Sequence, residues 1–158
     1  MKQFFYPKSV AVVGVSENPD NLGRNIVNNL LDFGFQGKIF PVGPKGGRVF
    51  DLDISPSLLD LPQPPDLVAV LAPARVVPDI LADCGRQGVK RVVVESGGFS
   101  ELGREGRKLE DQVRKQLREH QIRMMGPNGL GVINLEIGLC LPFMTMPGKP
   151  RLGGVSLI

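Results

Sequence analysis

The chain has 158 residues and a formal net charge of +3, with 42% hydrophobic and 22% charged residues. This length fits one domain with enough core to fold alone, and the composition is that of a globular protein. The apolar runs are far shorter than the roughly 20 residues that a membrane span needs. The first residues lack the long apolar core of a secretion signal. We therefore expect a cytoplasmic protein without a membrane partner.

Several functional classes are disfavoured by composition. A single histidine, His120, rules out a His-based triad or a multi-histidine metal site. Cys84 and Cys140 form no CxxC pair, so both are expected to be reduced packing residues. Basic residues gather between 104 and 123, but acidic residues are interleaved with them and no aromatic residue accompanies them. This pattern favours a solvated helix face over a nucleic-acid surface.

An apolar run, a glycine and a helical pattern follow one another near the start of the chain. Val10–Val13 predicts a buried strand that breaks at Gly14. Leu22, Ile26 and Leu30 recur at intervals of four and predict a helix. This is the first unit of a doubly wound α/β domain, and the unpaired N–H groups at such a helix start can hold a phosphate. A nucleotide-type ligand is therefore predicted.

The remaining elements alternate in the same way. Strands are predicted at 38–42, 66–71, 90–94 and 122–125, with helices from about 74 to 85 or 88 and from 104 to 120. Four prolines between 56 and 65 exclude a long helix there and allow one turn at 57–60. The prediction is a Rossmann-like fold of about five parallel strands with helices on both faces. Its strand-end loops share the edge where such sheets bind ligands.

Two loops bear on the choice of nucleotide. The strand at 38–42 lacks the terminal acid that a dinucleotide fold uses for the ribose hydroxyl, and Lys45 instead offers a cation to a phosphate on the adenosine ribose. The first loop is not GxGxxG, because the eight residues 15–22 separate Gly14 from Gly23. A loop of this size suits a bulky, bent ligand. The residues alone therefore favour coenzyme A or NADP over NAD.

Several spaced motifs occur in an order that resembles one known family, the coenzyme A-binding domain of the ADP-forming (NDP-forming) acyl-CoA synthetases. This is the superfamily of acetate–CoA ligase and the succinyl-CoA synthetase alpha subunit. The resemblance covers nearly the whole chain and is carried by residues 7–16, 37–46, 64–66, 72–73, 97–99 and 126–128. The chain departs from the family pattern at Gly129, where the family often has cysteine. It departs again at Glu95, where an apolar residue is common; a structural acid paired with Arg91 or Arg123 is the alternative interpretation of Glu95.

The resemblance implies a coenzyme A site with no catalytic residue and no metal ligand in this chain. The phosphates would lie against the first glycine loop and helix start, the adenosine at the end of the second strand, and the pantetheine chain along later strand-end loops. The implied residues are Gly14, Val15, Ser16, Leu22, Gly23 and Arg24 for the phosphates, Lys45, Pro41 and Val42 for the adenosine, and Ala72, Pro73, Ser96, Gly97 and Asn128 for the pantetheine.

The family's reaction interconverts acyl-CoA, ADP and phosphate with the free acid, coenzyme A and ATP. It passes through an acyl phosphate and a phosphohistidine on the next domain, a position that His120 does not match. We therefore expect residues 1–150 to be the coenzyme A-binding domain and 151–158 to begin a truncated ligase domain, because 153–158 looks like the opening of another strand. Such a segment would bind without turnover, and its partners would be the remaining ligase domains or a subunit with an ATP-grasp module.

Two other functions stay open at this point. One is an NAD(P)-binding Rossmann domain of an oxidoreductase or redox sensor, which the missing acid and the lack of a catalytic histidine or Tyr–Lys pair weaken. The other is a non-enzymatic coenzyme A-binding module. A multidomain protein such as an acetyltransferase carrying the same module is a variant of the leading interpretation.

Overall fold

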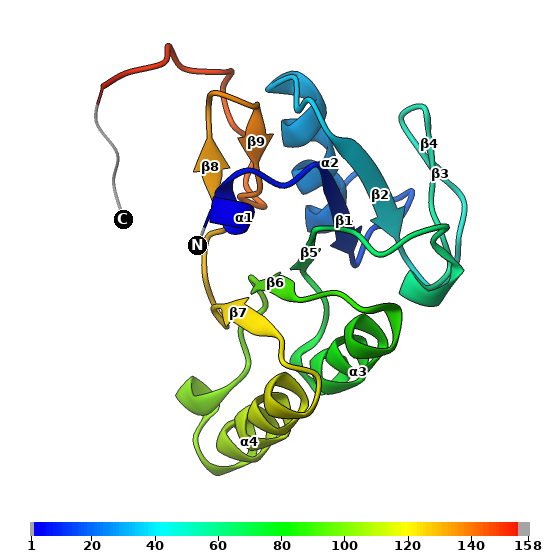
Figure 1. The fold of residues 1–158 in the computed structure, drawn as a ribbon, viewed down its shortest axis with the longest axis vertical. Helices are drawn as coiled ribbons and strands as arrows, with labels where there is room; N and C mark the ends of the chain where they lie inside the picture. Colours follow the sequence, from blue (N-terminus) through cyan, green and yellow to red (C-terminus); the bar gives the residue numbers. More distant parts are fainter. Residues whose placement is uncertain (1, 155–158) are drawn as a thin grey trace.

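The fold is built on a five-stranded parallel sheet, and the computed structural model describes residues 2–154 (Figure 1). The strand order is β2-β1-β5-β6-β7. Every residue of β1 and β5 is buried, which explains their continuous apolar sequences, since helices cover both faces. The predicted Rossmann-like α/β fold is confirmed. The strands are β1 (Ser9–Val13), β2 (Lys38–Val42), β5 (Leu67–Val70), β6 (Arg91–Val94) and β7 (Arg123–Met125).

Helices cover the sheet on both faces, as predicted (Figure 1). Helix α2 (Leu22–Asp32), which follows β1, packs Ile26 and Leu30 against one face. On the opposite face lie α3 (Val77–Gln87) and α4 (Arg104–Glu119). Successive residues of a strand alternate between the two core clusters because the pleat sends neighbouring side chains to opposite faces.

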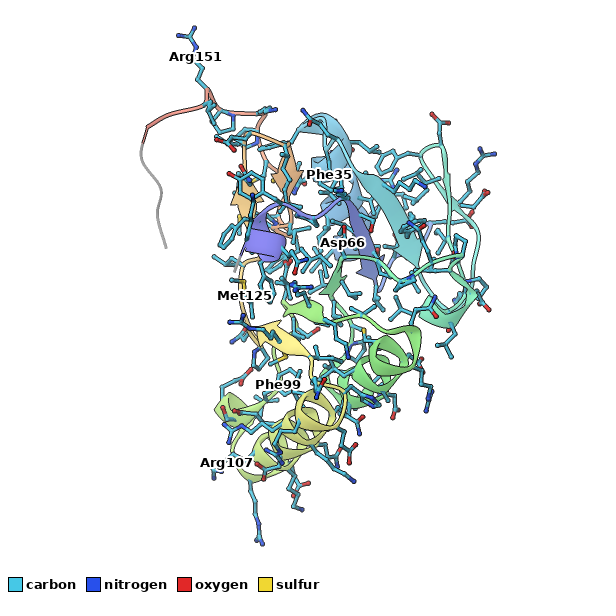
Figure 2. The ribbon with its side chains drawn as sticks, viewed as in Figure 1. Phe35, Asp66, Phe99, Arg107, Met125 and Arg151 are labelled. Carbon is cyan, nitrogen blue, oxygen red and sulfur yellow. The ribbon has the colours of Figure 1, made fainter. Side chains whose placement is uncertain are left out.

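The prolines and the charged helix behave as predicted. Residues 56–65 contain only the 3-10 turn η1 (Leu58–Asp60), and Pro78 lies in the first turn of α3, after the 3-10 turn η2 (Ala74–Val76). On α4, Val113 is buried whereas Arg107 points into solvent (Figure 2). Phe99, labelled in the same view, is buried where the 3-10 turn η3 (Ser100–Leu102) leads into α4. None of the described helices has the length and hydropathy required to cross a bilayer.

Short elements absent from the sequence prediction complete the fold. They are the helix α1 (Lys2–Phe5) and the hairpins β3 (Arg48–Val49) with β4 (Leu52–Asp53) and β8 (Ile133–Asn134) with β9 (Leu139–Cys140). The β8–β9 hairpin packs on the α2 face, and the chain after it is tied to α2 by buried Asn29, whose side chain donates to the Pro142 and Met144 carbonyls at 2.7 and 2.8 Å. The strand expected at 153–158 lies largely outside the described residues.

The packing of α2 gives a direct test of the fold. Leu30 is fully buried while its neighbour Leu31 is 42% exposed. We expect Leu30→Ala to lower the free energy of unfolding by about 2–5 kcal/mol, because it removes buried methyl groups and leaves a cavity. Leu31→Ala is the matched control and should change it by less than about 0.5 kcal/mol. Urea denaturation measures both, and equal losses would contradict the placement of α2.

Candidate functional site at the carboxyl edge of the sheet

Two adjoining cavities open at the carboxyl edge of the sheet, beside the ends of β1 and β5. Their volumes are about 460 and 590 Å³, and they share Ser16, Asn21 and the segment 71–73 as lining. Here the chain leaves β1 for α2 on one face and leaves β5 for α3 on the other. Such a switch point is where open α/β sheets bind their ligands. We call the smaller cavity the helix-side cavity and the larger one the lysine-side cavity.

All but three of the residues predicted from the sequence line these cavities. The helix-side cavity is lined by Leu22, Gly23, Ser96 and Gly97, the lysine-side cavity by Gly14, Val15, Val42 and Lys45, and both by Ser16, Ala72 and Pro73.

The three exceptions lie close by but do not line either cavity. Pro41 is buried in the edge strand β2, where its missing N–H costs no ladder hydrogen bond to a further strand. Asn128 donates its backbone N–H to the Ser96 carbonyl at 2.9 Å, beside Gly97. The Arg24 guanidinium lies 4.6 Å from the centroid of the Phe50 ring. The predicted set is thus brought to one edge, with these three behind or beside the cavity walls.

Close contacts at three glycines shape the site. Gly14 has a φ of 104°, which L side chains rarely adopt, and a Cβ there would overlap the Leu71 carbonyl at the end of β5. A Cβ on Gly43 would overlap the Val15 carbonyl, and one on Gly23 would lie 2.7 Å from the Gly14 carbonyl. The loops after β1 and β2, the end of β5 and the start of α2 therefore meet with their backbones in direct contact.

The loop after β1, residues 14–16, is called the glycine loop, and its backbone N–H groups already have hydrogen-bond acceptors within the protein. The N–H groups of Gly14 and Val15 both donate to the Val42 carbonyl at 3.0 Å, and that of Ser16 donates to Asn21 Oδ1 at 3.2 Å. In the described part of the chain, the N–H groups of Leu22 and Gly23 have no protein acceptor. The start of α2 therefore brings free backbone donors to the wall of the helix-side cavity, while the loop sets the shape around them.

Asn21 holds this arrangement together and was missed by the sequence analysis. Its Oδ1 accepts from the Arg24 N–H at 2.8 Å and so caps α2, and its Nδ2 donates to the Gly14 carbonyl at 3.0 Å. The signal was present, since asparagine immediately before a helical pattern is a favoured cap. One side chain thus links the glycine loop to the helix start and also lines both cavities.

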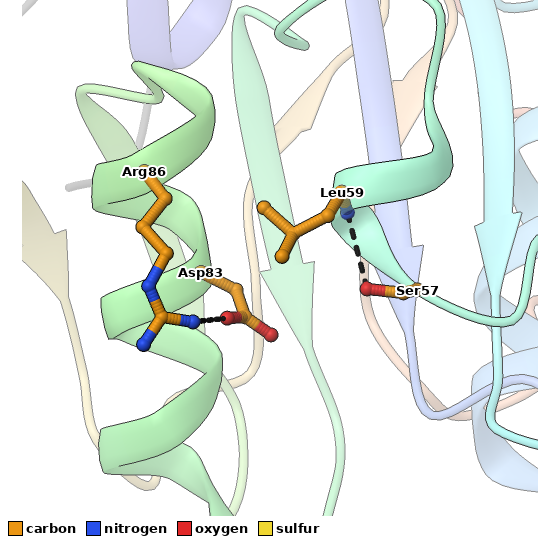
Figure 3. A network of polar contacts seen from close by, with 4 residues as sticks. All are labelled: Ser57, Leu59, Asp83 and Arg86. Atoms are coloured by element: carbon orange, nitrogen blue, oxygen red, sulfur yellow. Dashed lines mark hydrogen bonds and ion pairs between the residues drawn. The ribbon is translucent and has the colours of Figure 1, made fainter.

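The lysine-side cavity has apolar walls and a polar rim. Val42, Leu58, Val76 and Ile80 contribute to the walls, together with prolines from the loops. Figure 3 shows two rim groups facing one another across the space between η1 and α3: the Ser57 hydroxyl accepts from the Leu59 N–H at 3.1 Å, and Asp83 pairs with Arg86. Exposed Lys45 also lines this cavity. Such walls suit a flat ring or an alkyl chain, with an anion at the lysine.

Glu95 lies at the end of β6 as an unpartnered buried carboxyl group. Its side chain is 3% exposed, and neither oxygen has a hydrogen-bond partner among the described residues. Burial raises the pKa of Glu95 to about 8; the Phe143 backbone N–H is near enough to lower it in part but does not meet hydrogen-bond geometry. A Cβ on Gly131 would lie 2.8 Å from Oε1, so this glycine leaves room for the carboxyl group. The expected pairing of Glu95 with Arg91 or Arg123 is wrong, because the side chain turns into the core beneath the β8–β9 hairpin.

The cysteines are both free and buried, as expected for packing residues. Burial raises the pKa of the Cys84 thiol to about 12, and burial together with the nearby Glu95 carboxylate raises that of Cys140 to about 12. Both thiols therefore stay protonated at neutral pH.

The buried Glu95 predicts a pH dependence of stability. Its pKa is about 8 in the folded chain against an ordinary value of 4.5. Between these values the unfolded state has lost the proton that the folded state keeps, so stability falls as pH rises and levels off above about 8. We expect a slope near 1.4 kcal/mol per pH unit at most. Urea titrations of Glu95→Gln between pH 5.5 and 8 should lack this component, and identical slopes in both proteins would refute it.

The cap at Asn21 gives a second prediction. Asn21→Ala removes three hydrogen bonds at the helix start and should lower the free energy of unfolding by about 1–2 kcal/mol. Asn28→Ala is the control, because among residues 2–154 the Asn28 side chain bonds only Asp32, at an exposed position of the same helix. That change should cost less than about 0.5 kcal/mol. Chemical denaturation distinguishes the two, and an equal effect would show that Asn21 carries no special role.

Comparison with known proteins agrees with this architecture. The chain is 42% identical over its full length to ADP-forming acetate–CoA ligase II of Archaeoglobus fulgidus, of which it covers 23%. It is 41% identical over 84% of its length to the alpha subunit of ADP-forming acetate–CoA ligase I of Pyrococcus furiosus, of which it covers 30%. The apo structure of dinucleotide forming acetyl-coenzyme A synthetase 1 from Ca. Korarchaeum cryptofilum matches with a TM-score of 0.88 and 33% identity, over 97% of this chain and 32% of that one.

The chain therefore spans from 23% to 32% of the length of these relatives. The family described as the CoA binding domain matches residues 8–134, which include every strand of the central sheet and every residue that lines the two cavities. The resemblance recognised in the sequence is confirmed, and the chain belongs to the CoA binding domain family.

Proposed function

We propose that the chain binds coenzyme A in the two adjoining cavities, as the coenzyme A-binding part of an ADP-forming acid–CoA ligase. The observation that carries this proposal is the position of the cavities. They lie at the switch point of the sheet, beside the ends of β1 and β5, and the larger cavity extends to Lys45 in the loop after β2. The relatives named above, all ADP-forming or dinucleotide-forming CoA ligases or synthetases by name, supply the identity of the ligand class.

The phosphates find donors at two places in this proposal. Leu22 and Gly23 line the helix-side cavity and, among the described residues, their N–H groups have no protein acceptor, and the start of α2 adds a partial positive charge. Lys45 lies in the lysine-side cavity, where it would meet the phosphorylated adenosine. Gly14, Val15 and Ser16 would shape the space rather than donate to the ligand, because their amide groups are already engaged.

The apolar parts of the ligand find matching walls. Val42 and the neighbouring loops would pack on the adenosine, with Pro41 supporting them from within β2. The pantetheine chain would run past Ala72 and Pro73 toward Ser96 and Gly97. The Ser96 side chain is held by a hydrogen bond from the Ala72 N–H at 3.0 Å, which fixes the two strand-end loops relative to each other. Asn128, bonded to Ser96 through its backbone, would lie nearest the thiol end.

The rest of the ligase reaction would be supplied by further domains. His120 ends α4 and packs on Gly85 of α3, at the amino edge of the sheet and away from both cavities. It therefore offers no group for phosphoryl transfer at the proposed site. Residues 1–150 would hold coenzyme A, and further ligase domains or a subunit with an ATP-grasp module would perform the phosphoryl chemistry. This division fits the share of its relatives that the chain covers.

Ligand binding by the purified chain tests the proposal. Calorimetry and thermal unfolding with coenzyme A, 3′-dephospho-coenzyme A, NADH and NADPH should show coenzyme A binding most tightly. A ligand concentration of about 100 times Kd should add about 2.7 kcal/mol of apparent stability. Stabilisation by NADH without any by coenzyme A would contradict the proposal and favour a dinucleotide-binding domain.

Lys45→Ala should weaken coenzyme A binding about tenfold and remove most of the advantage over the dephospho form. This magnitude is near the lower end for a charge-assisted contact, about 1.5 kcal/mol, because Lys45 is exposed. Lys38→Ala is the matched control. Lys38 is the first residue of β2, and Lys45 follows the other end of that strand. Lys38→Ala therefore removes the same charge at the opposite edge of the sheet. Unchanged discrimination in Lys45→Ala would place the adenosine phosphate elsewhere.

A further inference from the structure

The turn of the β3–β4 hairpin holds a residue in an unfavourable backbone conformation. Phe50 has a φ of 52° and is 38% exposed. Glycine or asparagine adopts this left-handed region with much less strain than a large aromatic residue. The turn itself therefore does not call for phenylalanine. Such a strained residue persists where its surroundings hold it, and it is often found at functional positions.

The hairpin is fixed to the loop that leaves β1. The backbone N–H of Arg48 donates to Glu17 Oε1 at 2.9 Å, and Gly47 packs so closely on Glu17 that a Cβ would lie 2.7 Å from its carboxyl carbon. The Ile54 N–H closes the hairpin on the Gly47 carbonyl at 2.9 Å. Phe50 is thus presented from a segment anchored beside the glycine loop and only five residues beyond Lys45.

Phe50 contacts Arg24, which also stands at a position that is unfavourable for its residue type. Arg24 stands in the first turn of α2, where the helix dipole disfavours a cation. Within residues 2–154, no carboxylate lies at ion-pair distance from its guanidinium, whose recorded contact is the Phe50 ring at 4.6 Å. A cation–π contact with a ring, unlike an ion pair, places no acceptor on the guanidinium N–H groups and leaves them able to donate to phosphate oxygens. A carboxylate partner would occupy them.

We propose that Phe50 is a positioning residue, which holds the Arg24 guanidinium beside the start of α2 so that it meets the phosphates of the bound coenzyme. This inference rests on the proposed function and adds to it the aromatic residue that orients Arg24, which the family resemblance already implied for the phosphates. Gly23, the neighbour of Arg24, lines the helix-side cavity, and the Phe50 ring holds the Arg24 guanidinium at 4.6 Å from its centroid.

A double-mutant cycle read by calorimetry with coenzyme A tests the proposal. Phe50→Leu keeps an apolar side chain and the same backbone strain but removes the π face, and should weaken binding about three- to fivefold, the size of an exposed cation–π contact. Phe50→Tyr keeps the π face and should bind as the original chain does. In an Arg24→Ala background, Phe50→Leu should have no further effect. Phe50→Gly relieves the strained φ, so it should weaken binding without lowering the free energy of unfolding.

The outcomes separate the two proposals. If the unmodified chain binds no coenzyme A, the proposed function fails and this inference fails with it. If the unmodified chain binds and Phe50→Leu binds equally well, the positioning role alone is overturned. That role is also overturned if Phe50→Leu weakens binding to the same degree with and without Arg24, or if Phe50→Tyr binds as weakly as Phe50→Leu, because either result would assign the effect to hairpin structure.

Discussion

At the carboxyl edge of the sheet, backbone carbonyls approach Gly14, Gly23 and Gly43 so closely that a side chain at any of them would displace its neighbour. These contacts bring four segments together: the loops after β1 and β2, the end of β5 and the start of α2. Asn21 then ties the glycine loop to the helix with three hydrogen bonds. Both cavities are formed by the same segments, so the geometry of the site follows from backbone packing rather than from any single reactive group.

The parts of the fold that are set by local pattern were predictable. Apolar runs such as Val10–Val13 identify strands buried on both faces, and the period of four from Leu22 identifies α2. The two hairpins were not predictable in this way. Each strand of β3–β4 and β8–β9 has two residues, too few for a periodic signal, and their turns lack the usual Asn-Gly or Asp-Gly pairs. They make contacts with distant segments: Glu17 accepts from the Arg48 N–H of the first hairpin, and the Phe5 carbonyl accepts from the Asn134 side chain of the second.

The candidate site was also predictable only in part. The resemblance to a known family named most of the residues that line the two cavities, including Lys45 and Ser96. The sequence did not reveal that the N–H groups of the glycine loop donate to Val42 and Asn21, because hydrogen-bond partners between loops depend on the assembled backbone. Nor did it reveal that Glu95 turns away from its arginine neighbours into the core. A carboxyl group next in sequence to Ser96 is thus separated from the proposed ligand by the alternation of the strand.

The account requires coenzyme A to cross the edge of the sheet between the helix start and the lysine loop. The most direct measurement is a crystal structure of this chain with coenzyme A bound. It should show the diphosphate within hydrogen-bond distance of the Leu22 and Gly23 N–H groups, the adenosine phosphate at Lys45, and the pantetheine chain running along Ala72 and Pro73. Coenzyme A bound at another surface, or with its phosphates away from both the α2 start and Lys45, would contradict the account.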